Sequence, residues 1–423
     1  MRHEEDLATL AGLNFRCTRH GPNARRRQAL APQAVQAVLA WHAALSATAY
    51  RPPAEPEPGA PPRGQVSGAT VHAWDTAAAG DWKRRARWPG EVASTSAGPA
   101  VDPTLPVEVI VLADGRVGGS TEALALDDPA WTVEAVRARP GALRVQRSAL
   151  IVLADATIVG LYLTQATDPA IAAVAADGLD LAAACPRTYP LKARGQWYGR
   201  HARHKRSTSR GYAGRNWVDG VQRFACPTGA AKQYITAYLP RRAQPGQLDA
   251  VRVARVFGGQ QTLERRHAPQ VAAQRLALAQ AADFPGLVPP LPLDALAATY
   301  VGVTKGFACP PHCDSSCKGT TETVLWHRPA GDAPFAFSIL EHNVVLDVCG
   351  AAVLYMSGAL THGTPPNALG THDTLGLVLM SKRSVLCPTP GGRAANRNVG
   401  KQALQPVAAS SSCATPPPPL GLA

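Results

Sequence analysis

The sequence carries little charge. Asp, Glu, Lys and Arg make up only 17% of its 423 residues, whereas hydrophobic residues make up 46%. Such a composition can bury a sizeable core, which excludes a chain that is disordered throughout, and the length suits two or three domains. Acidic residues are the scarcer kind, 30 against 43 basic ones, for a net charge of +13. This surplus favours a polyanionic partner, although a generally basic, solvated surface explains the charge alone equally well.

Features of exported and membrane proteins are also lacking. The nine cysteines are odd in number and mostly scattered, which excludes the disulfide framework of a small secreted domain. The N-terminus is acidic early and has no apolar core of a signal peptide. The most apolar run, 149–163, is too short to span a membrane and is interrupted by Asp155. We therefore expect an intracellular, soluble protein without a membrane partner.

Composition divides the chain into four regions. A helix is predicted over 28–48, followed by the proline-rich linker RPPAEPEPGAPPRG. β-branched alternation predicts strands within 105–164, and apolar patterns predict helices over 168–185 and 258–283. The predicted regions are 1–66 (N-terminal helix and linker), 67–190 (strand-rich, either a separate domain or a flank of the core), 191–387 (the core, with a basic segment) and 388–423 (a disordered tail).

A basic segment opens the third region. Residues 191–215, LKARGQWYGRHARHKRSTSRGYAGR, hold eight Lys or Arg and no acid, interleaved with aromatic residues. Cationic side chains pair with phosphates and aromatic rings stack on bases, so the segment favours nucleic-acid binding over a merely solvated basic loop. The candidate contacts are Trp197, Tyr198, Arg200, Arg203, Lys205, Arg206, Arg210 and Trp217.

From residue 297 onward, short apolar and β-branched runs alternate with Gly and Pro. The runs YVGVTKGF, ETVLWH, FAFSIL, NVVLDV, AAVLYMS and TLGLVLMS are each a plausible strand. Their spacing is typical of a sandwich or a double-sheet jelly roll. We therefore predict an α+β protein with a jelly-roll core and flanking helices.

The segment GFACPPHCDSSCKGT, 306–320, contains two overlapping candidate metal sites. In the first, four zinc ligands are Cys309, His312, Cys313 and Cys317. Structural zinc usually takes two separated cysteine pairs, and a single nine-residue segment rarely surrounds a tetrahedral ion unaided. In the second, His312 and Asp314 are two ligands of an iron that keeps open coordination positions, as Fe(II) oxygenases require.

The iron interpretation needs one more histidine. On a strand, residues i and i+2 point the same way, so His312 and Asp314 can reach one metal ion together. In AAVLYMSGALTHGTPPN, His362 follows a predicted strand and precedes Gly and prolines, where a facing strand can begin. His342 and His372 compete for this role, although a lone histidine is usually an ordinary surface or core residue. We favour iron held by His312, Asp314 and His362.

The stretch YVGVTKGFACPPHCD, together with AAVLYMSGALTHGTPPN, resembles the double-stranded β-helix core of Fe(II)-dependent dioxygenases. Within that superfamily it is most similar to the TET/JBP group, which oxidises the methyl group of 5-methylcytosine or thymine. The resemblance covers roughly residues 297–385. An H-x-D motif with a distal histidine also fits prolyl hydroxylases and protein demethylases, so the preference for TET/JBP depends on local sequence and on the basic segment.

One departure from the superfamily concerns the co-substrate. The superfamily places G-x-R-x-S about ten residues after the distal histidine, and its Arg grips 2-oxoglutarate. Here the stretch is GTHDT, 370–374, with His372 at the Arg position, and a neutral imidazole binds a carboxylate poorly. Lys382 is about 30 Å further along a continuous strand, whereas Arg328 could fold in. We assign His372 and Thr374 as candidate co-substrate contacts.

Loss of the Arg resembles the algal 5-methylcytosine-modifying branch of TET/JBP, which uses ascorbate. The resemblance implies an enzyme using Fe(II), O2 and ascorbate (or 2-oxoglutarate) that modifies 5-methylcytosine in DNA, and hence a nuclear protein. A base inside a duplex must be flipped out before its methyl group can reach a metal. Two alternatives stay open: a hydroxylase of a protein or small molecule, and a non-enzymatic nucleic-acid-binding module stapled by zinc.

Overall fold

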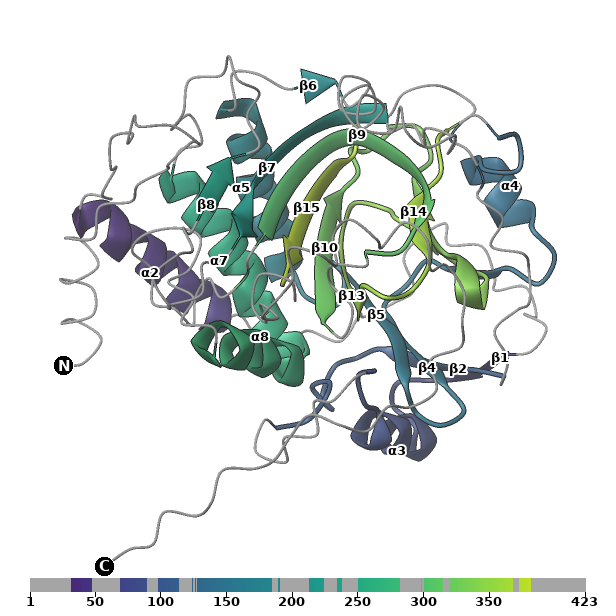
Figure 1. Ribbon diagram of the computed structural model, residues 1–423. Helices are drawn as coiled ribbons and strands as arrows, with labels where there is room; N and C mark the ends of the chain where they lie inside the picture. The colour runs from purple at the N-terminus through teal and green to yellow at the C-terminus, as the bar shows by residue number, and fades with distance from the viewer. Residues whose placement is uncertain are drawn as a thin grey trace, which may run out of the picture. The chain divides into compact units, whose positions relative to one another are not determined.

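The computed structural model describes residues 32–47, 69–89, 98–113, 128–184, 189–190, 213–223, 234–237, 250–281, 300–314, 320–367 and 373–381, with the single residues 124, 126 and 298. The chain separates into two units, Met1–Cys387 and Pro388–Ala423. All described residues belong to the first unit, which is a mixed α+β structure (Figure 1). None of its described helices is long and apolar enough to cross a membrane.

The described helices are α2 (Pro32–Ala47), α3 (Ala77–Arg85), α4 (Val133–Ala138), α5 (Ala170–Ala184), α7 (Ala250–His267), α8 (Pro269–Ala281) and the short 3-10 helix η3 (Leu340–His342). The described strands are β1 (Ala69–His72), β2 (Glu108–Leu112), β3 (Leu143–Val145), β4 (Ala149–Leu153), β5 (Ile158–Thr164), β6 (Tyr189–Pro190), β7 (Ala213–Arg223), β8 (Tyr234–Ala237), β9 (Tyr300–His312), β10 (Thr321–His327), β11 (Ala336–Ile339), β12 (Val344–Asp347), β13 (Ala351–Ser357), β14 (His362–Thr364) and β15 (Leu375–Met380).

These strands form one large, nearly closed sheet with two layers. The strand order is β1-β2-β4-β5-β13-β10-β15-β9-β14-β11-β12-β3, and β7 also pairs with β9. In this spatial order, we call the strands β1, β2, β4, β5, β13, β10, β15 and β9 the larger layer. The strands β9, β14, β11, β12 and β3 form the smaller layer. The long strand β9 belongs to both, because its first half pairs with β15 and its end pairs with β14.

The N-terminal strands continue the larger layer. Strand β5 pairs antiparallel with β13, β4 pairs with β5, and β2 pairs parallel with β4. Strand β3 extends the opposite end of the sheet by pairing parallel with β12. Strands from the predicted 67–190 and 191–387 regions therefore share one sheet, while the boundaries of those regions stay predictions.

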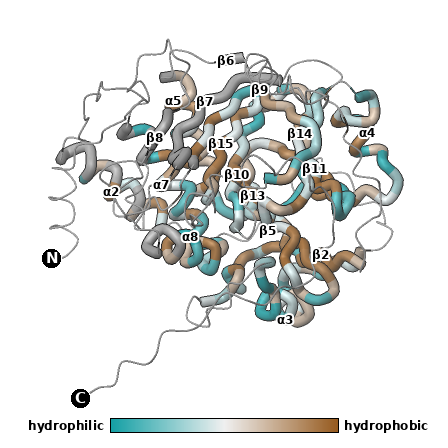
Figure 2. Tube along the Cα trace, viewed as in Figure 1, coloured by the Kyte–Doolittle hydropathy of each residue, from teal (hydrophilic) through white to brown (hydrophobic). Residues whose placement is uncertain are grey.

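Three apolar clusters explain why the layers and helices stack. The inner faces of the two layers meet in one cluster that includes Val324, Leu354, Phe337 and Leu346. The outer face of the larger layer packs against α5, α7 and α8, which Figure 1 shows gathered on one side of the sheet. Helix α4 covers the outer face of the smaller layer. In Figure 2 strands β2 and β15 are mainly hydrophobic, as strands buried on both faces must be.

The predicted elements agree with this fold except at one helix. The helices predicted over 28–48 and 168–185 are confirmed as α2 and α5, and the six predicted runs after residue 297 are all strands. The single helix predicted over 258–283 is wrong, because α7 ends at His267 and α8 begins at Pro269. Proline has no amide hydrogen and favours the first turn of a helix, so it divides the apolar run into two helices.

Candidate metal centre

Two of the predicted ligands lie at the end of strand β9 and just after it. It bends from the larger into the smaller layer, and a register shift between Cys309 and His312 accompanies its pairing with β14. His312 is the last residue of β9, so Asp314 lies beyond the strand rather than on it as H-x-D predicted. The amide of Asp314 donates to the carbonyl oxygen of Gly358 at 3.0 Å, which holds the residue near the start of β14.

His362 opens β14 directly opposite His312. The two imidazole centroids are 4.6 Å apart, and Nε2 of His362 is 3.8 Å from Oδ2 of Asp314. One ligand atom from each of the three residues lies within 4.8 Å of the others, and no second such cluster occurs in the described part of the chain. His362 is buried and the side chain of Asp314 is 28% exposed, so the solvent-accessible part of the cluster includes the carboxylate. It can hold a metal ion.

Both histidines are oriented by their own chain. Nδ1 of His312 donates to the carbonyl oxygen of Pro310 at 3.0 Å, and Nδ1 of His362 donates to that of Leu360 at 2.8 Å. Because a carbonyl oxygen only accepts, each hydrogen bond fixes the proton on Nδ1 and leaves the lone pair of the neutral ring on Nε2. Histidine ligands of metals are oriented in this way. The two Nε2 atoms and the Asp314 carboxylate therefore suit a divalent transition metal, and neither histidine has to change its tautomer to bind it.

The two rings have opposite electrostatic environments. Burial acts to lower the pKa of His312, but the adjacent Cys309 sulfur and the Asp314 carboxylate outweigh burial and raise that pKa well above its usual range. Burial and the positive charge of His312 lower the pKa of His362, against the opposing effect of Asp314. Two rings in contact cannot both carry a proton at low cost, so a metal cation is the partner that suits both neutral rings together.

Trp131 supports the cluster from behind. Its indole Nε1 donates to the carbonyl oxygen of Cys309 at 2.9 Å, and its side chain is fully buried. A Cβ on Gly363, the residue after His362, would lie 2.7 Å from the Trp131 ring. Only a glycine therefore lets β14 approach the indole so closely. Trp131 thus contacts both strands that carry the histidines.

Aromatic rings extend from the cluster into the space between the layers. The Phe337 ring stacks on His362 at 5.5 Å, and Trp326 lies 5.1 Å from Phe337. Beyond Trp326, a Cβ on Gly376 would lie 2.4 Å from Oγ1 of Thr304. The rings of Phe337 and Trp326 therefore lie beside the cluster, and Thr304 adds a hydroxyl next to Trp326.

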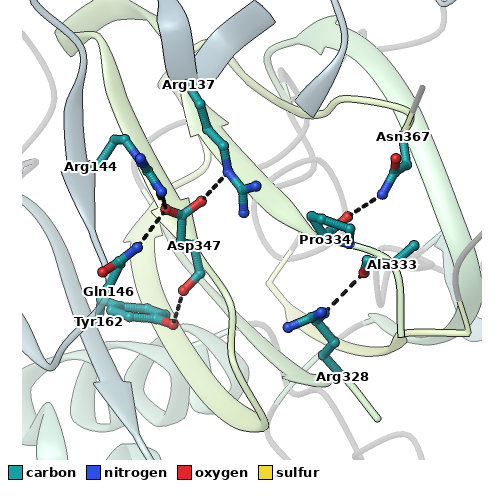
Figure 3. A network of polar contacts seen from close by, with 9 residues as sticks. All are labelled: Arg137, Arg144, Gln146, Tyr162, Arg328, Ala333, Pro334, Asp347 and Asn367. Atoms are coloured by element: carbon teal, nitrogen blue, oxygen red, sulfur yellow. Dashed lines mark hydrogen bonds and ion pairs between the residues drawn. The ribbon is translucent and has the colours of Figure 1, made fainter. Parts of the chain in front are cut away.

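The predicted co-substrate residues are only partly described. Thr374 precedes β15 and is buried, and its Oγ1 has no hydrogen-bond partner among the described residues. His372 and Lys382 lie outside the described residues. Arg328 does not replace the missing Arg, because its guanidinium is used within its own loop. It donates to the carbonyl oxygen of Ala333 (Figure 3) and also to that of Asp332.

The described part of the alternative zinc set does not converge. Cys309 is buried and accepts a hydrogen bond from the Thr364 amide at 3.3 Å, whereas the Cys313 thiol is exposed and lies 3.2 Å from Oγ1 of Thr361. Cys317 lies outside the described residues. The two thiols therefore have different surroundings, and neither belongs to the metal-binding cluster found among the described residues.

Most predicted nucleic-acid contacts also lie outside the described residues, namely Trp197, Tyr198, Arg200, Arg203, Lys205, Arg206 and Arg210. The backbone of Trp217 is described, and it pairs with Val303 across β7 and β9. The neighbours of the basic segment are placed as well. Pro190 pairs with Arg215, and Ala213 pairs with Ala308, a few residues before His312.

Asp347 is a buried carboxylate at the end of β12. Its side chain is 2% exposed and accepts hydrogen bonds from Nε of Arg137 at 2.6 Å, NH2 of Arg144 at 2.6 Å and Nε2 of Gln146 at 3.1 Å (Figure 3). The phenol of Tyr162 donates to its carbonyl oxygen at 3.3 Å. Asp347 therefore fastens α4 and β3 to β12 and takes no part in the metal cluster.

Sequence patterns missed Trp131 and Phe337. Trp131 reaches the centre across 178 residues of chain, and such a contact leaves no local signal. Phe337 lies in a predicted strand, but strand alternation alone does not say that it meets His362. The one available hint was Gly363 directly after His362, since glycine often marks a close approach of backbone and a neighbouring group.

No family model and no curated protein matches the chain. Solved structures do match, 40 chains in all, and one is NgTET1 in complex with 5mC DNA. That protein is 11% identical to this chain, the match covers 58% of this chain and 80% of the NgTET1 chain, and the TM-score is 0.35. A likeness at this level does not assign an activity to the chain.

Proposed function

We propose that the protein is an Fe(II)-dependent dioxygenase that modifies the methyl group of 5-methylcytosine in DNA, with ascorbate as co-substrate. The observation that carries the proposal is the convergence of His312, Asp314 and His362 within 4.8 Å of one another. Two imidazoles and one carboxylate on one side of a metal, with the remaining positions open, are the ligand set of non-haem Fe(II) oxygenases.

The strand order supports a double-stranded β-helix core. Successive strands alternate between layers: β10 lies in the larger, β11 and β12 in the smaller, β13 in the larger, β14 in the smaller and β15 in the larger. With β9 contributing one half to each layer, four strands face four, as in a jelly roll. The two histidines come from the adjacent strands β9 and β14 of the smaller layer.

The protein groups have separate tasks in this proposal. Fe(II), when bound, supplies the redox chemistry that activates dioxygen. The Nδ1 hydrogen bonds of His312 and His362 hold both rings ready, and Asp314 contributes the negative charge that favours a divalent cation. The rings of Phe337 and Trp326 limit water behind the cluster, which strengthens electrostatic interactions within it.

Two observations favour ascorbate over 2-oxoglutarate. By strand register, the side chains of β9 to β15 that share the inner face with His362 include no Lys or Arg among the described residues. Burying a dicarboxylate without a guanidinium or ammonium partner is costly, whereas ascorbate carries one negative charge in place of two and its remaining polar groups are hydroxyls that need only hydrogen-bond partners. The buried Thr374 hydroxyl, which has no described partner, is available to such a ligand.

DNA is favoured as the substrate by the place where the basic segment is attached. Pro190, which precedes the segment, pairs with Arg215 on β7, and Ala213 near the end of the segment pairs with Ala308 of β9, four residues before His312. The eight Lys and Arg of this segment suit contacts with phosphates on either side of a flipped nucleotide, and its aromatic residues suit the gap that the base leaves. A DNA substrate also favours a nuclear location.

The test is a reconstitution with purified protein, Fe(II), oxygen and 5-methylcytosine DNA. Separate reactions contain ascorbate alone, 2-oxoglutarate with a thiol reductant, or neither, and mass spectrometry quantifies modified nucleosides. We expect product with ascorbate alone, loss of product in His362→Ala, and retention in the matched control His342→Ala. DNA affinity should fall steeply with salt if phosphate contacts dominate.

The outcomes separate the alternatives. Product only with 2-oxoglutarate would mean that a basic residue outside the described part of the chain replaces the missing Arg. Metal binding without a nucleoside product and without salt-dependent DNA binding would favour a hydroxylase of a protein or small molecule. Zinc in the purified protein that persists in His362→Ala would overturn the oxygenase.

A further inference from the structure

A buried ion pair lies between the helices and the larger layer. Arg275 of α8 donates from Nε and NH2 to the two carboxylate oxygens of Glu264 in α7, at 2.9 and 3.0 Å. Their side chains are 1% and 0% exposed. Thr323 of β10 also donates to Glu264, at 2.5 Å. The pair is therefore shielded from solvent, and both carboxylate oxygens of Glu264 accept hydrogen bonds from the guanidinium.

Stability alone is a poor explanation for this pair. Removing two charges from water costs several kcal/mol per ion, and buried pairs are often replaced by apolar side chains without loss of stability. The distinguishing feature of Arg275 is its remaining donors. NH1 donates to Oγ of Ser381 at 2.7 Å and NH2 donates to the carbonyl oxygen of Thr321 at 3.1 Å. Arg275 thus fixes the start of β10 relative to the end of β15.

From there, hydrogen bonds connect Ser381, Thr320, Gly358 and Asp314 in turn, from residue to residue. Oγ1 of Thr320 donates to the carbonyl oxygen of Ser381 at 2.9 Å. The carbonyl oxygen of Thr320 accepts from the Gly358 amide at 3.3 Å, and the carbonyl oxygen of Gly358 accepts from the Asp314 amide at 3.0 Å. Asp314 lies beyond the end of β9, so strand pairing does not hold it and this series of contacts does.

We propose that Arg275 is a positioning residue for Asp314, acting through Ser381, Thr320 and Gly358. The inference rests on the metal cluster of the proposed function but on no particular substrate. Outer groups that orient metal ligands affect metal affinity, typically by 10- to 100-fold on removal. Because Arg275 acts through several contacts, the expected loss is at the lower end, roughly tenfold.

The test compares metal affinity with stability in the full-length chain. In the double variant Glu264→Leu with Arg275→Met, both charges are replaced by apolar groups of similar volume, so no buried charge is left unpaired. Co(II) is titrated into each metal-free protein and its absorption spectrum is followed, and thermal unfolding is measured without metal. We expect about tenfold weaker Co(II) binding with little change in Tm. Arg255→Met is the matched control, because Arg255 of α7 pairs with Asp177, away from this series.

A milder variant keeps the inference testable if the double variant does not fold. Thr320→Val removes only the hydroxyl that donates to Ser381 and should also weaken Co(II) binding severalfold. Unchanged Co(II) affinity in either folded variant, with tight binding by wild-type protein, would overturn the role of Arg275 and leave the proposed function intact. Failure of wild-type protein to bind Co(II) would instead overturn the metal centre and this inference with it.

Discussion

His312 and His362 lie opposite each other on adjacent antiparallel strands, and their ring planes are tilted by 54°. Each ring donates from Nδ1 to the carbonyl oxygen two residues before it. The orientation of both ligands is therefore encoded within the strands that carry them. The distance between the two strands is a separate matter, because it depends on residues packed behind them, such as Trp131.

Gly363→Ala tests that separation. The new Cβ would lie 2.7 Å from Cζ2 of Trp131 and 3.2 Å from the backbone of Pro310 and Pro311. Since backbone and a buried indole have little freedom to move, β14 must shift. We expect a loss of about 1–3 kcal/mol in the free energy of unfolding, measured in urea, together with weaker metal binding.

The control for this prediction is Gly80→Ala in α3, where the nearest atom to the new Cβ is the flexible end of Arg84 at 3.5 Å. Alanine is the better helix former, so this variant should be as stable as wild type or slightly more so. If Gly363→Ala keeps both wild-type stability and metal affinity, the indole does not set the spacing of the two strands.

Asp347→Asn tests whether the arginine contacts are structural. An amide of equal volume cannot accept all the donors of Arg137, Arg144 and Gln146 (Figure 3). We expect a loss of about 3 kcal/mol in urea unfolding, the lower end for a broken buried ion pair, because the two arginines are 24% and 42% exposed and can hydrate. Metal stoichiometry should stay at the wild-type value, and its loss would place Asp347 in the metal centre.

The sequence was most informative where chemistry and strand period coincide. His312 and Asp314 could be chosen from the H-x-D spacing, and His362 because it follows a predicted strand. The structure brings all three together, although Asp314 lies beyond β9 rather than on it. Side-chain alternation also located the strands of the core. It could not locate Trp131, whose contact with Cys309 spans 178 residues, nor the network from Arg275 to Asp314, whose members lie on separate elements. Tertiary contacts of this kind have no local period for a sequence to display.

Cys313→Ser discriminates iron from the structural zinc hypothesis. The Cys313 thiol is exposed, and its neighbour among the described residues is Oγ1 of Thr361. A serine hydroxyl fits the same position, so we expect unchanged stability and unchanged metal content. Elemental analysis of the purified variant checks this. A zinc staple through this thiol predicts the opposite, loss of the metal and of folded structure together.

His267 should make the protein less stable in mild acid. The side chain is fully buried, with Nε2 2.8 Å from Oδ2 of Asp168 and Nδ1 2.9 Å from the Tyr355 phenol. Burial lowers the pKa of His267, against the opposing effect of Asp168. Below the unfolded value of about 6.5, the unfolded chain takes up a proton that the folded chain refuses, so stability falls as pH falls from about 6.5, by at most about 1.4 kcal/mol per pH unit.

The measurement is urea unfolding at several pH values between 7.5 and 5. The buried His362, whose pKa is also lowered, adds a loss of stability of the same sign in this window, whereas Asp168 does not. Burial acts to raise the pKa of Asp168, but its contacts with His267 and Arg266 outweigh burial and lower that pKa, so Asp168 contributes its own loss of stability only in stronger acid, as pH falls below about 4. His267→Gln should reduce the slope between pH 7.5 and 5 to the part that His362 contributes. It should also lower stability at pH 7.5, because one of the two hydrogen bonds of His267 is lost. His72→Gln, at the edge strand β1, is the matched control and should keep the slope. If His267→Gln keeps the full wild-type slope, other groups account for the acid sensitivity and the imidazole of His267 is not a cause.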